Sequence, residues 1–176
     1  MQANARVFFA LVPPPSLQRA LAEIARESAR HAHGRPVPAE NLHVTLAFIG
    51  AWPSAQLSVL LDAAAGVHGE PIPLSLDRFG AFRRAGIAWI GSSVPPGALM
   101  QLAASLSQAM AAAGVALDAQ PFRPHMTLAR HCRGPYPQGA AGPFSFVADR
   151  FLLMQSETGA QGARYRPLAT WALRSG

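Results

Sequence analysis

Two short stretches of this chain carry residues that could do acid–base chemistry at a phosphate. Residues 43–47 read His-Val-Thr-Leu-Ala, and residues 125–129 read His-Met-Thr-Leu-Ala. In an extended strand, side chains two positions apart share a face of the sheet. The histidine and threonine of each stretch are therefore predicted to point to one face, while the apolar residues between them point to the other.

Two histidines across a cleft can divide proton transfer between them. Imidazole has an ordinary pKa of about 6.5, so it can accept or donate a proton near neutral pH. A neutral histidine would take a proton from water and a charged one would protonate a departing alkoxide, and each transfer typically contributes ~10²–10⁴-fold to the rate. Thr45 and Thr127 could donate hydrogen bonds to phosphate oxygens. Such a site needs neither a metal ion nor a cofactor.

Each of these residues also has an ordinary structural explanation. A lone histidine on an apolar strand is more often a packed core or edge residue than a proton donor. Threonine is a good strand former whatever its function. The recurrence of threonine at the same offset from histidine in both stretches is what favours the catalytic interpretation.

Composition limits the class of protein and of partner. The chain has 176 residues, half of them apolar, which suffices for one substantial folded domain. All 15 basic residues are arginines against 9 acidic residues, and the net charge of +6 favours anionic partners. The single cysteine, Cys132, excludes an internal disulfide and a Cys-x-x-Cys zinc site. We expect a cytoplasmic monomer with no signal peptide. A membrane segment is not expected either, because no apolar run approaches ~18 residues.

Hydrophobic periodicity and turn residues predict the elements that must position the two stretches. Helices are expected where apolar residues recur at helical spacing, and strands where they alternate or form short runs. The helices are predicted over residues 16–31, 54–67 and 97–113. The strands are predicted over residues 6–12, 42–49, 71–83, 86–92, 144–157 and 163–173, with the second motif on a strand of its own and a loop over 133–143. Long helices exclude an all-β sandwich, and no glycine-rich loop of the dinucleotide or Walker type is found.

Three other features invite functional interpretations. His31 and His33 could hold a metal ion, but they lack acidic or cysteine companions and are expected to be solvated. Cys132 could act as a thiol nucleophile, although no Asn or Asp that would orient a base is evident. Three arginines, Arg83, Arg84 and Arg133, lie in predicted turns, where they could contact RNA phosphates or simply be solvated.

The two motifs and their flanks resemble those of a known family. Residues 40–50 and 122–130 are similar to the paired His-x-Thr regions of the RNA 2′,3′-cyclic phosphodiesterases, also called 2′-5′ RNA ligases, in the 2H phosphoesterase superfamily. Residues 6–10 resemble the family's opening strand, and residues 153–157 followed by 162–165 resemble its closing hairpin. The resemblance covers nearly the whole chain, although residues 51–115 share only the layout.

This resemblance implies an α+β fold. It would be a bilobal, pseudo-symmetric 2H phosphoesterase-like arrangement of two antiparallel sheets flanking a central groove, with the helices outside. Residues 1–176 would form a single domain of two interwoven lobes. The order of elements read from periodicity agrees with that arrangement.

The resemblance also implies a role for each site residue. His43 would be the general acid toward the leaving ribose oxygen, and His125 the general base for water. Thr45 and Thr127 would hold the phosphate, and Arg130 would neutralise its charge. Strict alternation places Arg130 on the apolar face of its strand, so its role requires the strand to end or twist there.

Aromatic residues beside the motifs are ambiguous. Phe9 and Phe48 could stack on a base in the groove, but for an aromatic in an apolar strand core packing is the expected environment.

The function implied by the resemblance is metal-independent hydrolysis of RNA 2′,3′-cyclic phosphate ends to 2′-phosphates. The partners would be RNA ends or nucleotides that carry the cyclic phosphate. Two alternatives stay open. One is reversible 2′-5′ RNA ligation by the same groups, and the other is an RNA-end-binding module without turnover.

Overall fold

The computed structural model describes residues 3–176. It contains one β-sheet, whose strands come from all parts of the chain, and three α-helices. The elements follow in the order β1 (Asn4–Leu11), α1 (Pro15–His31), β2 (Arg35–Pro36), η1 (Ala39–Asn41), β3 (Val44–Pro53), η2 (Ser54–Gln56), α2 (Leu57–Ala65), β4 (Ile72–Phe82), η3 (Arg83–Ala85), β5 (Ile87–Gly91), α3 (Gly97–Ala112), β6 (Met126–Arg130), β7 (Ala140–Ala148), β8 (Arg150–Gly159) and β9 (Gly162–Ala172).

The sheet consists of two four-stranded halves. Its strand order is β7-β4-β5-β6-β3-β1-β8-β9. The short strand β2 pairs with the end of β6, at residues 129 and 130. We call β7-β4-β5-β6 the β6 half and β3-β1-β8-β9 the β3 half. Every pairing is antiparallel, and the halves join between β3 and β6 through the single pair Val44–Met126. The predicted α+β fold with two antiparallel sheet regions is confirmed.

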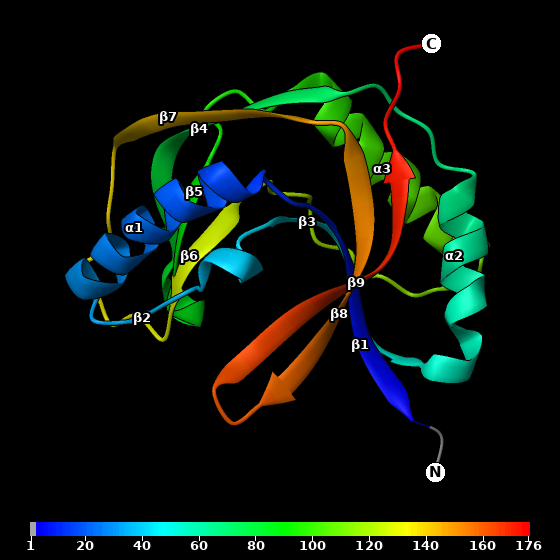
Figure 1. The fold of residues 1–176 in the computed structure, drawn as a ribbon, viewed down its shortest axis with the longest axis horizontal. Helices are drawn as coiled ribbons and strands as arrows, with labels where there is room; N and C mark the ends of the chain where they lie inside the picture. The colour runs from blue at the N-terminus through cyan, green and yellow to red at the C-terminus, as the bar shows by residue number, and fades with distance from the viewer. Residues whose placement is uncertain (1–2) are drawn as a thin grey trace.

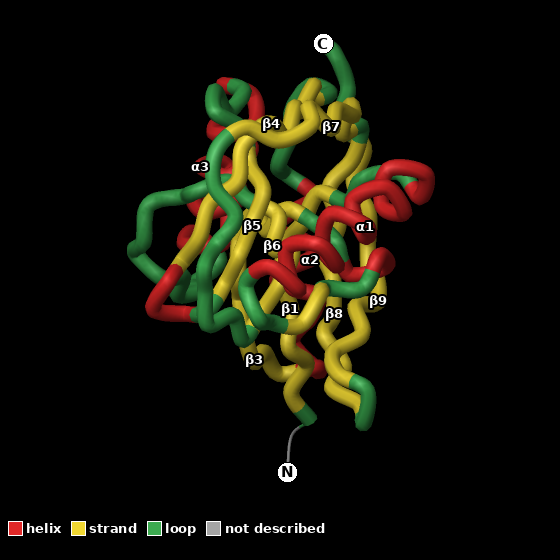
Figure 2. The backbone as a smooth tube through the Cα atoms, turned by 90° about the vertical axis from the view of Figure 1, so that its left-hand side faces the viewer, coloured by secondary structure: helices red, strands yellow, loops and turns green. Residues whose placement is uncertain are grey.

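The helices lie outside the sheet. Figure 1 shows α1 on the side of β5 and β6, and α2 with α3 on the opposite side of the molecule, while Figure 2 shows the strands running between them. Buried residues Leu21, Ala25 and Ala29 of α1 recur at helical spacing and face the core. No helix among residues 3–176 is long and apolar enough to cross a membrane.

Some predicted boundaries were wrong. The strand expected over 144–157 is two strands, because the chain leaves β4 after Ala148 and joins β1 and β9 from Arg150 onward. The first motif strand was expected to end at Gly50 but continues to Pro53, since Gly50 adopts a positive φ of 81° without breaking the pairing to β1. The second helix accordingly starts at Leu57, and the loop expected over 133–143 gives way to β7 at residue 140.

Candidate active site

His43 lies just before β3 and is held at both ring nitrogens. Its Nδ1 is 2.7 Å from the Asn41 carbonyl oxygen, and because a carbonyl only accepts, Nδ1 carries the hydrogen. Its Nε2 is 2.9 Å from the Thr45 hydroxyl, which donates to it when the ring is neutral. The ring packs between Phe8 and Tyr165, with centroid distances of 4.8 and 5.2 Å. Burial among these groups lowers the pKa of His43 from 6.5 to about 4.

Asn41 fixes the loop that orients His43. Its side chain is buried, and its Nδ2 donates a 2.7 Å hydrogen bond to the carbonyl oxygen of Ala163 at the start of β9. The Asn41 carbonyl that receives the His43 proton is therefore tied to the closing hairpin. The sequence predicted no role for Asn41, Phe8 or Tyr165. The contacts of Phe8 and Tyr165 with His43, and the bond from the Asn41 side chain to Ala163, depend on the pairing of distant strands.

His125 lies just before β6 in a related but more open setting. Its Nδ1–H donates to the Arg123 carbonyl oxygen over 2.7 Å, which leaves Nε2 as the proton acceptor of the neutral ring. The ring packs edge-on against Phe82 at 4.8 Å and lies 6.1 Å from Trp89. Burial is the main cause that lowers the pKa of His125.

The single pair that joins the sheet halves also brings the two motifs together. Val44 and Met126 are Cα partners and both are fully buried. Continued in the antiparallel direction, this register sets Thr45 against His125 and His43 against Thr127, all on the face opposite the buried pair. The charge of His125 also lowers the pKa of His43, which agrees with their sharing one groove.

A β-bulge follows the threonine in both motif strands. Along β1, the partner of Phe9 is Ala47 but the partner of Ala10 is Thr45, so Leu46 is an extra residue. Along β5, Trp89 pairs with Thr127 and Ala88 with Ala129, so Leu128 is the extra residue. In each strand the leucine and the next alanine are both buried, which reverses the alternation for the residue that follows.

The residue after each bulge therefore faces the groove. Arg130 is exposed, and its positive charge lowers the pKa of both His43 and His125. The twist that a phosphate role for Arg130 requires is thus present. Phe48 pairs directly with Phe8, which contacts His43, and 46% of its surface is exposed.

The two candidate aromatics thus occupy different environments. The expectation that Phe48 packs in the core was wrong, because the bulge at Leu46 turns it outward. Phe9 is fully buried, 6.4 Å from Phe151 and 5.9 Å from Trp171, as expected for a core residue.

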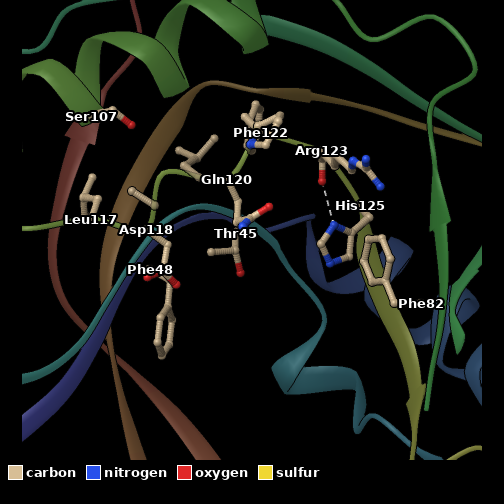
Figure 3. A pocket seen from close by; sticks show the side chains of 13 residues that line it. Thr45, Phe48, Phe82, Ser107, Leu117, Asp118, Gln120, Phe122, Arg123 and His125 are labelled. Carbon is tan, nitrogen blue, oxygen red and sulfur yellow. Dashed lines mark hydrogen bonds between the residues drawn. The ribbon is translucent and has the colours of Figure 1, made fainter. Parts of the chain in front are cut away.

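A cavity of about 470 Å³ is lined by His125 and by Thr45, the hydrogen-bond partner of His43. Thr45, His125 and Phe82 line one part of it, and Phe48 and Asp118 line another. Figure 3 shows His125 and Phe82 on one side of this space and Phe48 with Asp118 on the other. Its size suits a ligand of nucleotide dimensions, with the reacting group at the histidines and an aromatic surface further along.

The remaining sequence candidates lie elsewhere. Residues 3–176 contain no group of three or more His, Cys, Asp or Glu side chains placed to hold a metal ion, so His31 and His33 have no such companions. Cys132 is buried, and burial raises the pKa of its thiol, which disfavours the thiolate that a nucleophile needs. Arg83 lies over the Tyr136 ring at 5.4 Å.

Comparison with known proteins agrees with this geometry. The model of the family described as LigT-like phosphoesterase matches the chain twice, over residues 11–89 and 90–165, and each match contains one His-x-Thr motif. An RNA 2′,3′-cyclic phosphodiesterase of Escherichia coli K12 is 34% identical over 98% of this chain and 99% of its own length. One from Thermus thermophilus is 29% identical over 96% of this chain and 90% of its own.

The fold agrees as well. The crystal structure of E. coli LigT complexed with 3′-AMP superposes with a TM-score of 0.91 at 32% identity, covering 98% of this chain and 100% of that one. The boundary between the two family matches, at residues 89 and 90, falls within β5. Each half of the sheet contains strands from before and after that boundary.

Proposed function

Because the chain belongs to the LigT-like phosphoesterase family, we propose that it hydrolyses 2′,3′-cyclic phosphate ends of RNA to 2′-phosphates without a metal ion. One observation carries the proposal. Both histidines donate Nδ1–H to a backbone carbonyl, of Asn41 and of Arg123, so both offer Nε2 to the groove. This is the arrangement that in-line displacement at phosphorus needs from an acid and a base.

In the proposed reaction, His125 Nε2 removes a proton from water as the water oxygen forms a bond to phosphorus. The bond from phosphorus to the 3′-oxygen breaks, and His43 Nε2–H gives its proton to that oxygen. The products are a free 3′-hydroxyl and a 2′-phosphate. Each histidine is left in the opposite protonation state, and proton exchange with solvent restores both.

The acid role requires His43 to be charged when substrate is bound. In the free protein its pKa of about 4 keeps it neutral at pH 7. Burial is the largest cause, but the positive charge of Arg130 also lowers this pKa. An anionic phosphate between His43 and Arg130 favours the charged imidazole, so substrate binding raises the pKa of His43 and brings in the proton.

Phosphate and nucleoside would be held by different residues. Thr45 and Thr127 donate hydroxyl hydrogen bonds to the non-bridging oxygens, and Arg130 neutralises their charge. Phe48 provides an exposed ring on which a base can stack, beside the 470 Å³ cavity. We place this reaction in a cytoplasmic monomer, a single domain of two interwoven lobes.

The same groups support a second activity. With an RNA 5′-hydroxyl in place of water, they would form a bond from that oxygen to phosphorus, release the 3′-oxygen and join RNA ends through a 2′-5′ linkage; the reverse step would cleave that linkage. The third candidate, binding of RNA ends without turnover, would use Arg130 and Phe48 but would not need two histidines that both carry the ring hydrogen on Nδ1.

Incubation with a 2′,3′-cyclic nucleotide in excess EDTA tests the proposal. We expect turnover to a 2′-phosphate that survives EDTA and falls by ~10²–10⁴-fold in His43→Ala and in His125→Ala. Full activity in either variant would contradict the proposal. Addition of 5′-hydroxyl RNA separates ligation from hydrolysis, and tight binding without turnover would favour the third candidate.

A further inference from the structure

A second, strongly basic cavity lies at the far end of β6. Its volume is about 360 Å³, and it is lined by His33, Gly34, Arg35, His131 and Arg133. These residues come from the segment after α1 and the segment after β6. The lining contains two guanidinium groups, two imidazoles and no carboxylate, so the cavity repels cations and attracts anions.

The walls of this cavity are fixed against one another. The Arg133 amide donates to the Ala32 carbonyl over 2.9 Å, which ties the second segment to the end of α1. Gly34 has no space for a side chain, because a Cβ there would lie 2.6 Å from Cys132 Sγ and 2.7 Å from the Arg130 carbonyl oxygen. Such close backbone approach holds the basic side chains around one space before any ligand arrives.

Both histidines of the cavity adopt a strained backbone conformation. His33 has a φ of 50° and His131 a φ of 55°, and among residues 3–176 they are the two non-glycine residues with positive φ. The left-handed region costs a non-glycine residue of order 1–3 kcal/mol, and such residues cluster at binding sites. Here the strain directs both imidazoles to the same cavity.

The cavity adjoins the end of β6 that carries Arg130. Arg35 of β2 is the Cα partner of Arg130, and directly opposed residues of an antiparallel pair place their side chains on the same face. Arg130 is also close enough to influence the pKa of both active-site histidines. The cavity lies beyond Arg130, past the end of β6. A cyclic phosphate held by the histidines and Arg130 does not fill it, but a short RNA strand that continues along β6 can reach it.

We propose that this cavity binds a backbone phosphate of the RNA strand, upstream of the nucleotide that carries the cyclic phosphate. The inference rests on the proposed function and adds that the preferred substrate is an oligonucleotide. Arg35 and Arg133 supply the charge, since neither takes part in the salt bridges found within the described residues. The imidazoles of His33 and His131 donate hydrogen bonds to the same phosphate.

A length series tests the inference. The probes are a 2′,3′-cyclic mononucleotide and single-stranded RNAs of two to five nucleotides with the same cyclic end. In the wild-type protein, kcat/KM is expected to rise about tenfold or more at the length that first fills the cavity. In the double variant Arg35→Ala/Arg133→Ala that step disappears, while the mononucleotide is hydrolysed as before.

A matched control separates the local site from general electrostatics. Arg19→Ala/Arg174→Ala removes the same charge from exposed positions elsewhere on the protein and should keep the step. The salt dependence gives a second readout. For binding of a single-stranded RNA with a 2′-phosphate end, loss of one phosphate contact reduces the slope of log K against log salt by ~0.7.

The outcomes distinguish this inference from the proposed function. Mononucleotide turnover without a length step, or a step that survives Arg35→Ala/Arg133→Ala, would overturn the inference alone. Absence of turnover on every probe would overturn the proposed function. In that case the 2′-phosphorylated RNA still decides, because affinity that is independent of length would also reject the cavity as a phosphate site.

Discussion

The strands β3 and β6 carry the same short motif and the same bulge, yet they build different surroundings for it. His43 is enclosed by Phe8 and Tyr165, and its Nε2 is hydrogen-bonded to the Thr45 hydroxyl. His125 lies in a more open position against Phe82. The repeated backbone thus supplies two equivalent imidazoles, and the residues packed around them make the pair unequal. In the free protein that inequality keeps His43 neutral, so its proposed role as the acid depends on the bound phosphate.

The position after the bulge shows the same division. It is Phe48 in β3 and Arg130 in β6, and both reach the groove because the bulge reverses alternation. An aromatic ring suits a base, and a guanidinium suits a phosphate. One backbone device has therefore placed two chemically different groups at equivalent points around the site.

The largest effect is expected for Arg130, the positively charged residue of this pair. Arg130→Ala should lower kcat by about 10²–10³-fold, as is typical when one group that stabilises transition-state charge is lost. It should also raise the pKa of both histidines in the free protein, because the nearby positive charge is gone. Steady-state kinetics and NMR titration of the imidazoles measure the two effects.

Arg19→Ala is the control for Arg130→Ala, since it removes an exposed arginine of α1 far from the motif strands in sequence. It should leave kcat within about twofold of the wild type. An Arg130→Ala variant with nearly wild-type kcat, or unchanged histidine pKa values, would mean that Arg130 does not act at the phosphate.

The unequal burial of the histidines should appear as acid sensitivity. The pKa of His43 is about 4 in the folded protein against 6.5 when unfolded, so between these values the unfolded state binds more protons. Stability is therefore complete above pH 6.5 and falls as the pH is lowered toward 4. The loss from His43 is at most about 3 kcal/mol, at 1.36 kcal/mol per pKa unit.

Urea unfolding at pH 7 and pH 4.5 measures this contribution. His43→Gln should reduce the acid-induced loss of stability more than His125→Gln, because His43 is the more enclosed ring. Equal effects of the two substitutions would show that the two halves do not differ in this way.

The smallest effect is expected for Phe48, the aromatic residue of this pair. Phe48→Ala should raise KM for a cyclic nucleotide by about tenfold with little change in kcat, since stacking contributes ~1–3 kcal/mol per base. Phe48→Tyr should behave like the wild type. Ribose 2′,3′-cyclic phosphate, which lacks a base, should be hydrolysed equally by the wild type and Phe48→Ala. A Phe48→Ala defect on that compound would place Phe48 in a role other than stacking.

The sequence was enough to predict those side-chain orientations that depend only on neighbouring residues in the same strand. Alternation in a strand is a local rule, and it predicted a shared face for His43 and Thr45 in one strand and for His125 and Thr127 in the other. The rule failed at Phe48 and gave no means of turning Arg130 toward the groove. The extra residues of the bulges are ordinary leucines, Leu46 and Leu128, and the bulges are defined only by the partner strands.

Non-local pairing explains the other differences. The passage from β7 to β8 at Asp149 is marked in the sequence only by the charged residues Asp149 and Arg150, with no glycine or proline to indicate a turn. The contact of Asn41 with Ala163 joins residues far apart in the chain. The catalytic and phosphate-binding roles of the motif residues remain predictions that only kinetics can test.

The division of labour between the two histidines is tested most directly with a substrate that needs no general acid. A 3′-deoxynucleoside 2′-(p-nitrophenyl phosphate) releases p-nitrophenolate, which leaves without protonation. On this compound His43→Ala should retain activity within about tenfold of the wild type, while on the cyclic nucleotide it loses ~10²–10⁴-fold. His125→Ala should lose activity on both. Equal losses for the two variants on both substrates, or the reverse pattern, would contradict the assignment of His43 as acid and His125 as base.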